Sequence, residues 1–164
     1  MFRSKFGIDY TGWWKRDMQK TYQSGFMSDK TARLNTSANY GGNWVLSNTL
    51  QYKFDLGKSN FDILIGQEMM KYRLEDMSAG RDGFLLENED YMYLSVGDGN
   101  LRNGGGATSY ALSSFFGKVN YSYDNRYLAS VTVRRDGSSR FGANNRWGTF
   151  PAFSVGWRVS EEGF

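Results

Sequence analysis

The chain has 164 residues, and its composition excludes several classes of protein before any motif is considered. It contains no Cys and no His, so disulfide frameworks, thiolate sites and the commonest metal ligand and general base are absent. The formal net charge is +3, and Lys and Arg are scattered rather than clustered. This distribution argues against nucleic acid as a partner.

The apolar runs are far shorter than the roughly 20 residues that a membrane-spanning helix needs. A transmembrane β-barrel remains compatible with the sequence, because its strands alternate apolar and polar faces and keep the mean hydropathy low, here −0.60. Residues 1–6 lack the apolar core of a secretory signal peptide. We therefore expect either a cytoplasmic chain or an internal piece of a longer one.

Apolar and polar residues alternate with period two in six segments, and this alternation predicts strands with one apolar and one polar face. In the first segment the even positions are mostly apolar and the odd positions are charged or small. The same pattern returns on both sides of each tight turn, which predicts antiparallel hairpins. The predicted strands cover residues 2–10, 44–54, 61–72, 110–123, 127–136 and 150–160.

The predicted connections alternate in length along the chain. Residues 11–38 and 73–109 are expected to be long loops, residues 55–60 and 124–126 tight turns, and residues 137–147 a polar loop of medium length. Short turns on one side of the membrane and long loops on the other are typical of outer-membrane barrels. The sequence therefore predicts an all-β, antiparallel, up-and-down transmembrane barrel segment of about six strands, with its long loops outside the cell and its short turns in the periplasm.

The polar faces of the predicted strands carry many ions, which suits a water-filled lumen. Unpaired ions in a dry core would cost several kcal/mol each. The opposite faces, with Val131, Val155 and Trp157, are expected to contact lipid, and aromatic residues near strand ends, among them Phe61 and Phe150, are expected to form an interfacial girdle. The residues predicted to face the lumen are Lys118, Arg134, Asp136 and Arg158.

Aromatic residues in the predicted extracellular loops are candidates for contact with substrate, because their faces can stack on sugar rings. The alternative is that they pack the loops together or against a partner. These candidates are Trp13, Trp14, Tyr91, Tyr93 and Trp147.

No catalytic, metal or cofactor site is predicted. The glycines of residues 97–106 are not followed by the Lys-Ser/Thr of a phosphate loop and lack the acidic spacing of an EF-hand. Asp62 and Glu68 would lie near 20 Å apart on one strand at about 3.3 Å per residue, too far to act as a general acid and base on one bond. We therefore do not expect an enzyme.

The last third of the chain contains three distinctive blocks in close order. They are NYSYDNRY at residues 120–127, RRDGSSRF at residues 134–141, and FP with SVGWR at residues 150–158. Together these blocks resemble the SusC/RagA-type TonB-linked outer-membrane transporters of Bacteroidetes. Residues 43–70 are similar to the preceding hairpin of that family, with looser motifs, and the resemblance is expected to cover residues 1–164.

This resemblance implies an importer of large nutrients, either glycan fragments or peptides, in the cell outer membrane. The implied partners are a SusD-like surface lipoprotein, the TonB complex acting through an N-terminal region, and outer-membrane lipid. The family's barrel encloses a plug, and a plugged barrel needs about 22 strands. We therefore expect residues 1–164 to be a partial barrel domain, without signal peptide or plug, that does not transport alone.

The block at residues 134–141 has two interpretations. In the first, Arg134, Asp136 and Arg140 contact substrate or the plug, with Lys118 and Arg158 also facing the lumen or plug. In the second, the block is a strand end and a turn, in which Asp136 accepts backbone hydrogen bonds and Gly137 supplies an unusual φ angle.

The alternative to a transporter is a soluble β-sandwich or barrel that binds carbohydrate through its loop aromatics. The two hypotheses differ in one structural expectation. A soluble domain would bury the face that carries Val131, Val133, Val155 and Trp157, whereas a membrane barrel would leave that face uncovered.

Overall fold

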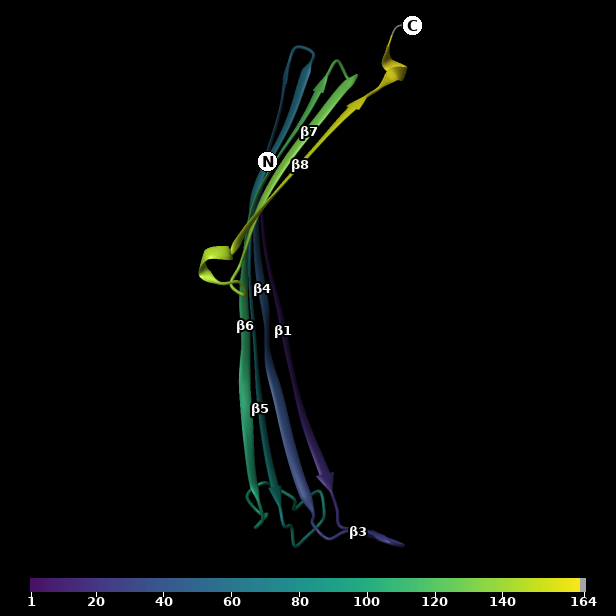
Figure 1. Ribbon diagram of the computed structural model, residues 1–164, viewed down its shortest axis with the longest axis vertical. Helices are drawn as coiled ribbons and strands as arrows, with labels where there is room; N and C mark the ends of the chain where they lie inside the picture. Colours follow the sequence, from purple (N-terminus) through teal and green to yellow (C-terminus); the bar gives the residue numbers. More distant parts are fainter. Residues whose placement is uncertain (163–164) are drawn as a thin grey trace. The chain divides into compact units, whose positions relative to one another are not determined.

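The computed structural model describes residues 1–162, and most of them form one antiparallel sheet (Figure 1). Its six strands are hydrogen-bonded to their neighbours in chain order, so the predicted all-β, up-and-down architecture is confirmed. No helix of the described residues is long and apolar enough to cross a membrane. The strands of the sheet are β1 (Phe2–Gln19), β4 (Arg33–Leu56), β5 (Ser59–Asp82), β6 (Leu101–Tyr123), β7 (Tyr127–Ser138) and β8 (Trp147–Trp157).

Short elements fill the connections between the long strands. β2 (Tyr22–Ser24) and β3 (Met27–Asp29) form a separate antiparallel hairpin between β1 and β4. A 3-10 turn, η1 (Ala143–Asn145), lies between β7 and β8, and a second, η2 (Val159–Glu161), follows β8.

Contacts divide the chain into two units. The turn unit comprises Met1–Ile8, Asn43–Tyr72 and the chain from Tyr110 onward, and the loop unit comprises Asp9–Gly42 and Arg73–Ser109. The turn unit contains the β4–β5 and β6–β7 turns, and the loop unit contains the β2–β3 hairpin and residues 83–100.

Both tight turns of the turn unit are confirmed. Gly57 adopts a φ of 61°, and Asp124 and Asn125 adopt φ values of 51° and 55°. This left-handed region suits Gly and is tolerated by Asp and Asn, which explains the choice of residues. Lys58 Nζ donates a 2.8 Å hydrogen bond to the Asp124 carboxylate, and the Asp124 N–H donates to the Lys58 carbonyl. These two hydrogen bonds therefore link the two turns.

The predicted long loops are wrong over much of their length, because β1, β4, β5 and β6 continue into them. Only residues 20–32 and 83–100 lie between these strands, and Gly104, Gly105 and Gly106 belong to β6. The extensions of β4, β5 and β6 carry mostly polar and small residues on both faces, and that of β1 carries a Trp on each face, so they lack the alternation by which a strand is recognised. The loop after β7 is likewise shorter than predicted, and β8 begins at Trp147 and ends at Trp157.

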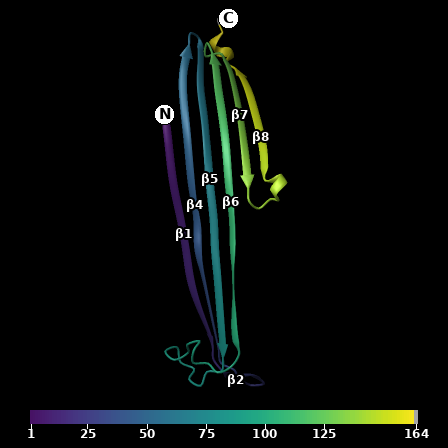
Figure 2. The ribbon, with the colours of Figure 1, turned by 90° about the vertical axis from the view of Figure 1, so that its left-hand side faces the viewer.

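Strand register brings the apolar side chains of the turn unit onto one face. Val131 lies opposite Val119 on β6 and opposite Phe153 on β8. Phe153 and Val155 are 85% and 89% exposed, so nothing in the described chain covers this face. The turn unit is a single layer of strands (Figure 2), which contradicts the β-sandwich alternative. The buried apolar cluster lies in the loop unit and consists of Ala32, Leu34, Phe84 and Met92.

Aromatic rings form a continuous row on the apolar face, next to the tight turns. Phe54 stacks on Phe61 with ring centroids 4.9 Å apart, and Tyr52 and Tyr121 extend the row at 5.5 and 5.0 Å. This row has the composition and position of the predicted girdle. Phe150 does not belong to it, because register places it opposite Arg134 on the polar face.

Gly137 does not supply the unusual φ angle that the turn interpretation predicted. Among the glycines of the described residues, positive φ values belong to Gly25, Gly41, Gly57 and Gly83, and Gly137 is not one of them. A Cβ at Gly137 would lie 2.9 Å from three ring atoms of Trp147, its cross-strand partner. Gly137 is therefore required because the Trp147 ring covers it.

We predict that Gly137→Ala lowers stability by about 1 kcal/mol, because the added methyl group displaces an indole ring that is held between neighbours. The measurement is the apparent melting temperature of the detergent-purified protein, followed by circular dichroism. Gly142→Ala is the matched control, since a Cβ there meets nothing within 4 Å. Equal melting temperatures for the two variants would contradict the assignment.

Candidate functional site

The polar face of the turn unit is built by the same register that builds the apolar one. Lys118 lies opposite Thr132, and Arg134 lies opposite Phe116 on one side and Phe150 on the other. Alternation along β7 adds Asp136 to this face. Three of the four residues predicted to face a lumen therefore share one face. Arg158 follows β8, where its N–H donates to the Arg126 carbonyl beside a tight turn.

Arg134 and Asp136 form an ion pair within one strand. Arg134 Nε donates to both carboxylate oxygens of Asp136, at 2.8 and 3.0 Å, and its Nη2 donates to Ser114 Oγ at 3.1 Å. The guanidinium also lies over the Phe116 ring, 5.6 Å from its centroid. Asp136 thus accepts hydrogen bonds from a side chain rather than from the backbone, which corrects that part of the turn interpretation. The pair is oriented and presents a polar surface of fixed geometry.

The loop between β7 and β8 is held against β6 by backbone and aromatic contacts. The Ser139 N–H donates to the Ala111 carbonyl, and the Ala111 N–H donates to Ser139 Oγ. Arg140 stacks on Tyr110 at 4.1 Å, and Tyr110 stacks in turn on Tyr72 with centroids 5.0 Å apart. Tyr110 has the parity of Ser114 on β6, so this stack lies on the polar face.

A hollow of about 600 Å³ opens between this loop and the strands. Arg146 borders it, and the Arg146 Nε donates to the Phe141 carbonyl at 3.3 Å. The hollow combines cationic and apolar side chains, with one carboxylate. Its lining includes Leu112, Arg134, Asp136, Phe141, Arg146 and Phe150.

The five aromatic candidates are not gathered into one site. Tyr91 and Tyr93 lie in the loop of residues 83–100, as predicted, whereas Trp13 and Trp14 belong to β1 and Trp147 to β8. The Trp147 ring packs near Phe115, with centroids 6.1 Å apart, and under Arg135. Trp147 therefore lies on the apolar face of the turn unit, away from the polar face where a substrate in a lumen would lie.

Trp13 and Trp14 lie on opposite faces of β1. Trp14 lines a hollow of about 230 Å³ with Thr36 and Leu94, and Met18 packs against the buried cluster. Arg16 and Met18 thus lie against the loop of residues 83–100, and Trp14, on the same face, borders that loop at Leu94 and stays 66% exposed. Trp13 projects from the other face, because neighbouring residues of a strand alternate. Of the two, only Trp13 is free of this loop.

Arg16 fastens the covering loop to β1. Its guanidinium donates hydrogen bonds to the Met92 carbonyl and, at 3.0 Å, to the Glu89 carbonyl. It also lies over the Tyr93 ring, 5.2 Å from the centroid. Thr21 adds a second attachment, since its N–H and Oγ1 both donate to the Glu87 carboxylate at 2.7 Å. The alternative role for Tyr93, packing within the loop, is therefore supported.

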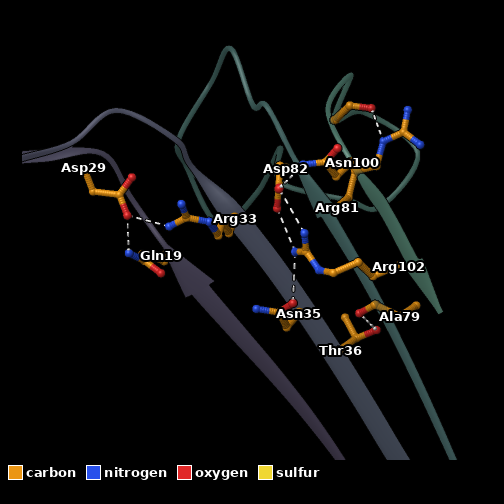
Figure 3. A network of polar contacts seen from close by, with 11 residues as sticks. Gln19, Asp29, Arg33, Asn35, Thr36, Ala79, Arg81, Asp82, Asn100 and Arg102 are labelled. Atoms are coloured by element: carbon orange, nitrogen blue, oxygen red, sulfur yellow. Dashed lines mark hydrogen bonds and ion pairs between the residues drawn. The ribbon is translucent and has the colours of Figure 1, made fainter. Parts of the chain in front are cut away.

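A network around Asp82 was not predicted (Figure 3). Arg102 donates to both Asp82 carboxylate oxygens, at 2.9 and 2.7 Å, and Asn100 donates at 3.2 Å. Arg102 also reaches Asn35 Oδ1 at 3.2 Å. Asp82 is 6% exposed. The hydrogen bonds from Arg102 lower the pKa of this carboxyl from its ordinary value, against the opposing effect of burial.

The Asp82 network closes the base of the loop of residues 83–100. The chain leaves β5 at Asp82 and returns at Asn100, where the Asp82 N–H donates to the Asn100 carbonyl. Gly83 makes the exit with a φ of 73°. No sequence signal indicates this pairing, because partners twenty residues apart across a loop follow no period. Among residues 1–162 no cluster of acidic side chains could hold a metal ion.

We predict that Asp82→Asn loosens residues 83–100, because Arg102 loses its charged partner. Hydrogen exchange of peptides from this loop is the measurement, and Asp90→Asn, at an exposed site in the same loop, is the control. The lowered pKa sets the pH dependence. The ion pair contributes fully above the pKa of an unfolded Asp, about 4, and its contribution is lost as the pH falls through the lower pKa of the folded protein.

In the wild-type protein, loop protection should therefore fall as the pH drops below about 4. In the Asp82→Asn variant it should be low throughout. A variant whose loop stays as protected as that of wild type would contradict the role of the ion pair.

No family model matches the chain. It is 40% identical over 119 residues to the TonB-dependent receptor SusC of Bacteroides thetaiotaomicron, an alignment that covers 70% of this chain and 11% of that receptor. It is 48% identical over 80 residues to the TonB-dependent receptor P39 of Formosa agariphila, covering 47% of this chain and 8% of the relative.

Solved structures of a transporter also match the fold of this chain. The RagAB peptide importer in the "open-open" state superposes with a TM-score of 0.84 at 27% identity, covering 94% of this chain and 17% of that chain. The RagAB peptide transporter superposes with a TM-score of 0.82 at 28% identity. The chain thus spans less than a fifth of the length of the proteins it matches.

Proposed function

Because the chain belongs to the SusC/RagA-type family of TonB-dependent receptors, we propose that it forms part of the barrel wall of an outer-membrane importer of large nutrients. Residues 1–164 would be a partial barrel domain, and transport would need the rest of the receptor. The relatives are receptors and transporters, and no catalytic role is proposed.

The observation that carries the proposal is the pair of unlike faces in the turn unit. One face exposes Phe153, Val155 and their neighbours, and the other gathers Lys118, Arg134 and polar side chains. A wall with lipid on one side and water on the other requires this division. Crossing a bilayer takes about 9–11 residues of tilted strand, and β7 and β8 have 12 and 11. Outer-membrane lipid is therefore the proposed environment of the apolar face.

The orientation that we propose places the two tight turns in the periplasm and the long connections, residues 20–32 and 83–100, outside the cell. The order of connection lengths supports it, since outer-membrane barrels have short periplasmic turns and longer extracellular loops. The strands that reach the loop unit are also much longer than a bilayer needs, with 24 residues each in β4 and β5.

The proposed partners are a SusD-like surface lipoprotein, which would cover the extracellular side, and the TonB complex, which would act through a part of the receptor other than this chain. The similarity to the RagAB peptide importer supports the first. The similarity to TonB-dependent receptors supports the second. The proposed substrates are glycan fragments or peptides, the latter in line with the cargo of RagAB.

We predict that Val131→Arg lowers the amount of folded receptor in the outer membrane, because a cation on the lipid face costs about 2–4 kcal/mol near the midplane. Thr132→Arg is the matched control, since it puts the same charge one residue further along β7 on the polar face. The measurement is the heat-modifiable, surface-labelled fraction of receptor on gels. A receptor that tolerates Val131→Arg and fails with Thr132→Arg would reverse the assignment of the faces.

For substrate contact we keep Trp13 as the leading candidate of the five aromatic residues. Trp13→Ala should weaken substrate binding about twofold to tenfold, the range of a single aromatic contact. Trp14→Ala should leave affinity unchanged and instead loosen the loop around Leu94, because Trp14 lines a hollow with Leu94. Titration of the purified receptor with neutral oligosaccharides and peptides measures the affinities. A loss confined to Trp14→Ala would contradict the choice of Trp13.

A further inference from the structure

The hollow beside the β7–β8 loop differs from the rest of the polar face. Phe141 and Phe150 border it and remain 60% and 59% exposed. Elsewhere on this face of β6 and β7, register brings together Lys118, Thr132 and Ser130, and the apolar side chains there, Phe116 and Leu128, are half-buried. Large apolar side chains exposed in a polar, hydrated setting are typical of a binding site for a partly apolar ligand.

The charge around this hollow is positive. Arg134 is already paired with Asp136, which neutralises the single carboxylate of the lining. Arg146 donates from Nε to the Phe141 carbonyl, and within residues 1–162 it forms no salt bridge. Its terminal nitrogens are therefore available for an anion. Arg140, at the other end of the loop, is stacked on Tyr110 and likewise forms no salt bridge among the described residues.

We propose that this hollow binds a carboxylate of the transported substrate, with Arg146 as its main cation and Phe141 and Phe150 holding the adjoining apolar part. The proposal rests on the importer function proposed above and adds a substrate class to it. A guanidinium binds a carboxylate through two parallel hydrogen bonds, and Arg146 is anchored at Nε in a manner that leaves its outer edge exposed. The oriented Arg134 and Asp136 pair would form the floor of the site.

Two kinds of nutrient carry a carboxylate next to an apolar surface. One is the C-terminal residue of a peptide, and the other is a uronate unit in an acidic oligosaccharide, whose ring has apolar C–H faces. The same cation and aromatic rings would hold either. Uncharged counterparts of both can be prepared, so the carboxylate itself can be tested.

The experiment measures binding to the detergent-purified receptor by titration calorimetry with two pairs of probes. The first pair is a tetrapeptide ending in Leu with a free C-terminus and the same peptide as its amide. The second pair is an oligogalacturonate and its methyl ester. We expect at least one acid to bind about tenfold or more tightly than its uncharged counterpart, the effect of a hydrogen bond to a charged group. A preference in only the first pair identifies peptides, and one in only the second identifies acidic glycans.

Arg146→Gln should abolish this preference, while retaining a side chain that can still donate to the Phe141 carbonyl. Arg135→Gln is the matched control, because it removes the same charge from the apolar face, where Arg135 lies over Trp147. The proposal is overturned if neither acid is preferred, if neither acid binds, if Arg146→Gln keeps the preference, or if Arg135→Gln loses it equally.

Uptake assays separate this inference from the proposed function. A receptor that assembles in the outer membrane and imports a neutral nutrient, yet shows no acid preference, refutes the carboxylate site and leaves the importer intact. If Arg146→Gln reduces uptake of neutral and acidic nutrients alike, the hollow serves a contact with another part of the receptor, and the substrate site is refuted. Absence of the receptor from the outer membrane would instead refute the proposed function.

Discussion

The hydrogen-bond register between neighbouring strands is the constraint on which the rest of this structure depends. Side chains alternate across a sheet, so a slip of one residue between β6 and β7 would exchange the two faces. With the register observed, Val119, Val131 and Phe153 lie in one row and Lys118, Thr132 and Ala152 in the next. The apolar wall, the polar face and the hollow beside the β7–β8 loop all follow from this alignment.

The strands of the two units are held in register by different contacts. In the turn unit the apolar face is left uncovered, and tight turns fastened by Lys58 and Asp124 hold the strands in line. In the loop unit an 18-residue excursion folds back onto the strands, buries Leu34 and Met92, and is closed at its base by Asp82 and Arg102. A lipid environment suits the first arrangement, and water suits the second.

The sequence was most informative where one face of a strand is apolar. The strands around Val131 and Val155, and the turns at Gly57 and Asp124, were predicted because alternation and turn chemistry are local signals. The extension of β6 through Gly104 was missed because polar and small residues occupy both of its faces. A strand with polar residues on both faces shows no alternation of apolar and polar residues, so the sequence does not predict it.

The candidate sites were less predictable than the fold. Lys118, Arg134 and Asp136 were predicted to share one face, because the alternation of side chains along each strand is enough to assign their face. The Asp82–Arg102 pair, the hollow that Trp14 shares with Leu94, and the packing of Trp147 over Gly137 depend on contacts between distant segments. Such contacts leave no spacing in the sequence, and for Trp147 a misplaced strand boundary also concealed the face on which it lies.

If the sheet is part of a barrel wall, the face of Val131 contacts lipid and the face of Thr132 contacts water. Single substitutions Val131→Cys and Thr132→Cys, in a chain that has no Cys of its own, allow a nitroxide label to be placed on each face of the receptor in lipid vesicles. Collision of the label with oxygen, which concentrates in lipid, is compared with collision with a water-soluble nickel chelate. We expect collisions with oxygen to dominate at position 131 and collisions with the chelate to dominate at position 132. Equal access of the chelate to both positions, or the reverse order, would contradict this expectation.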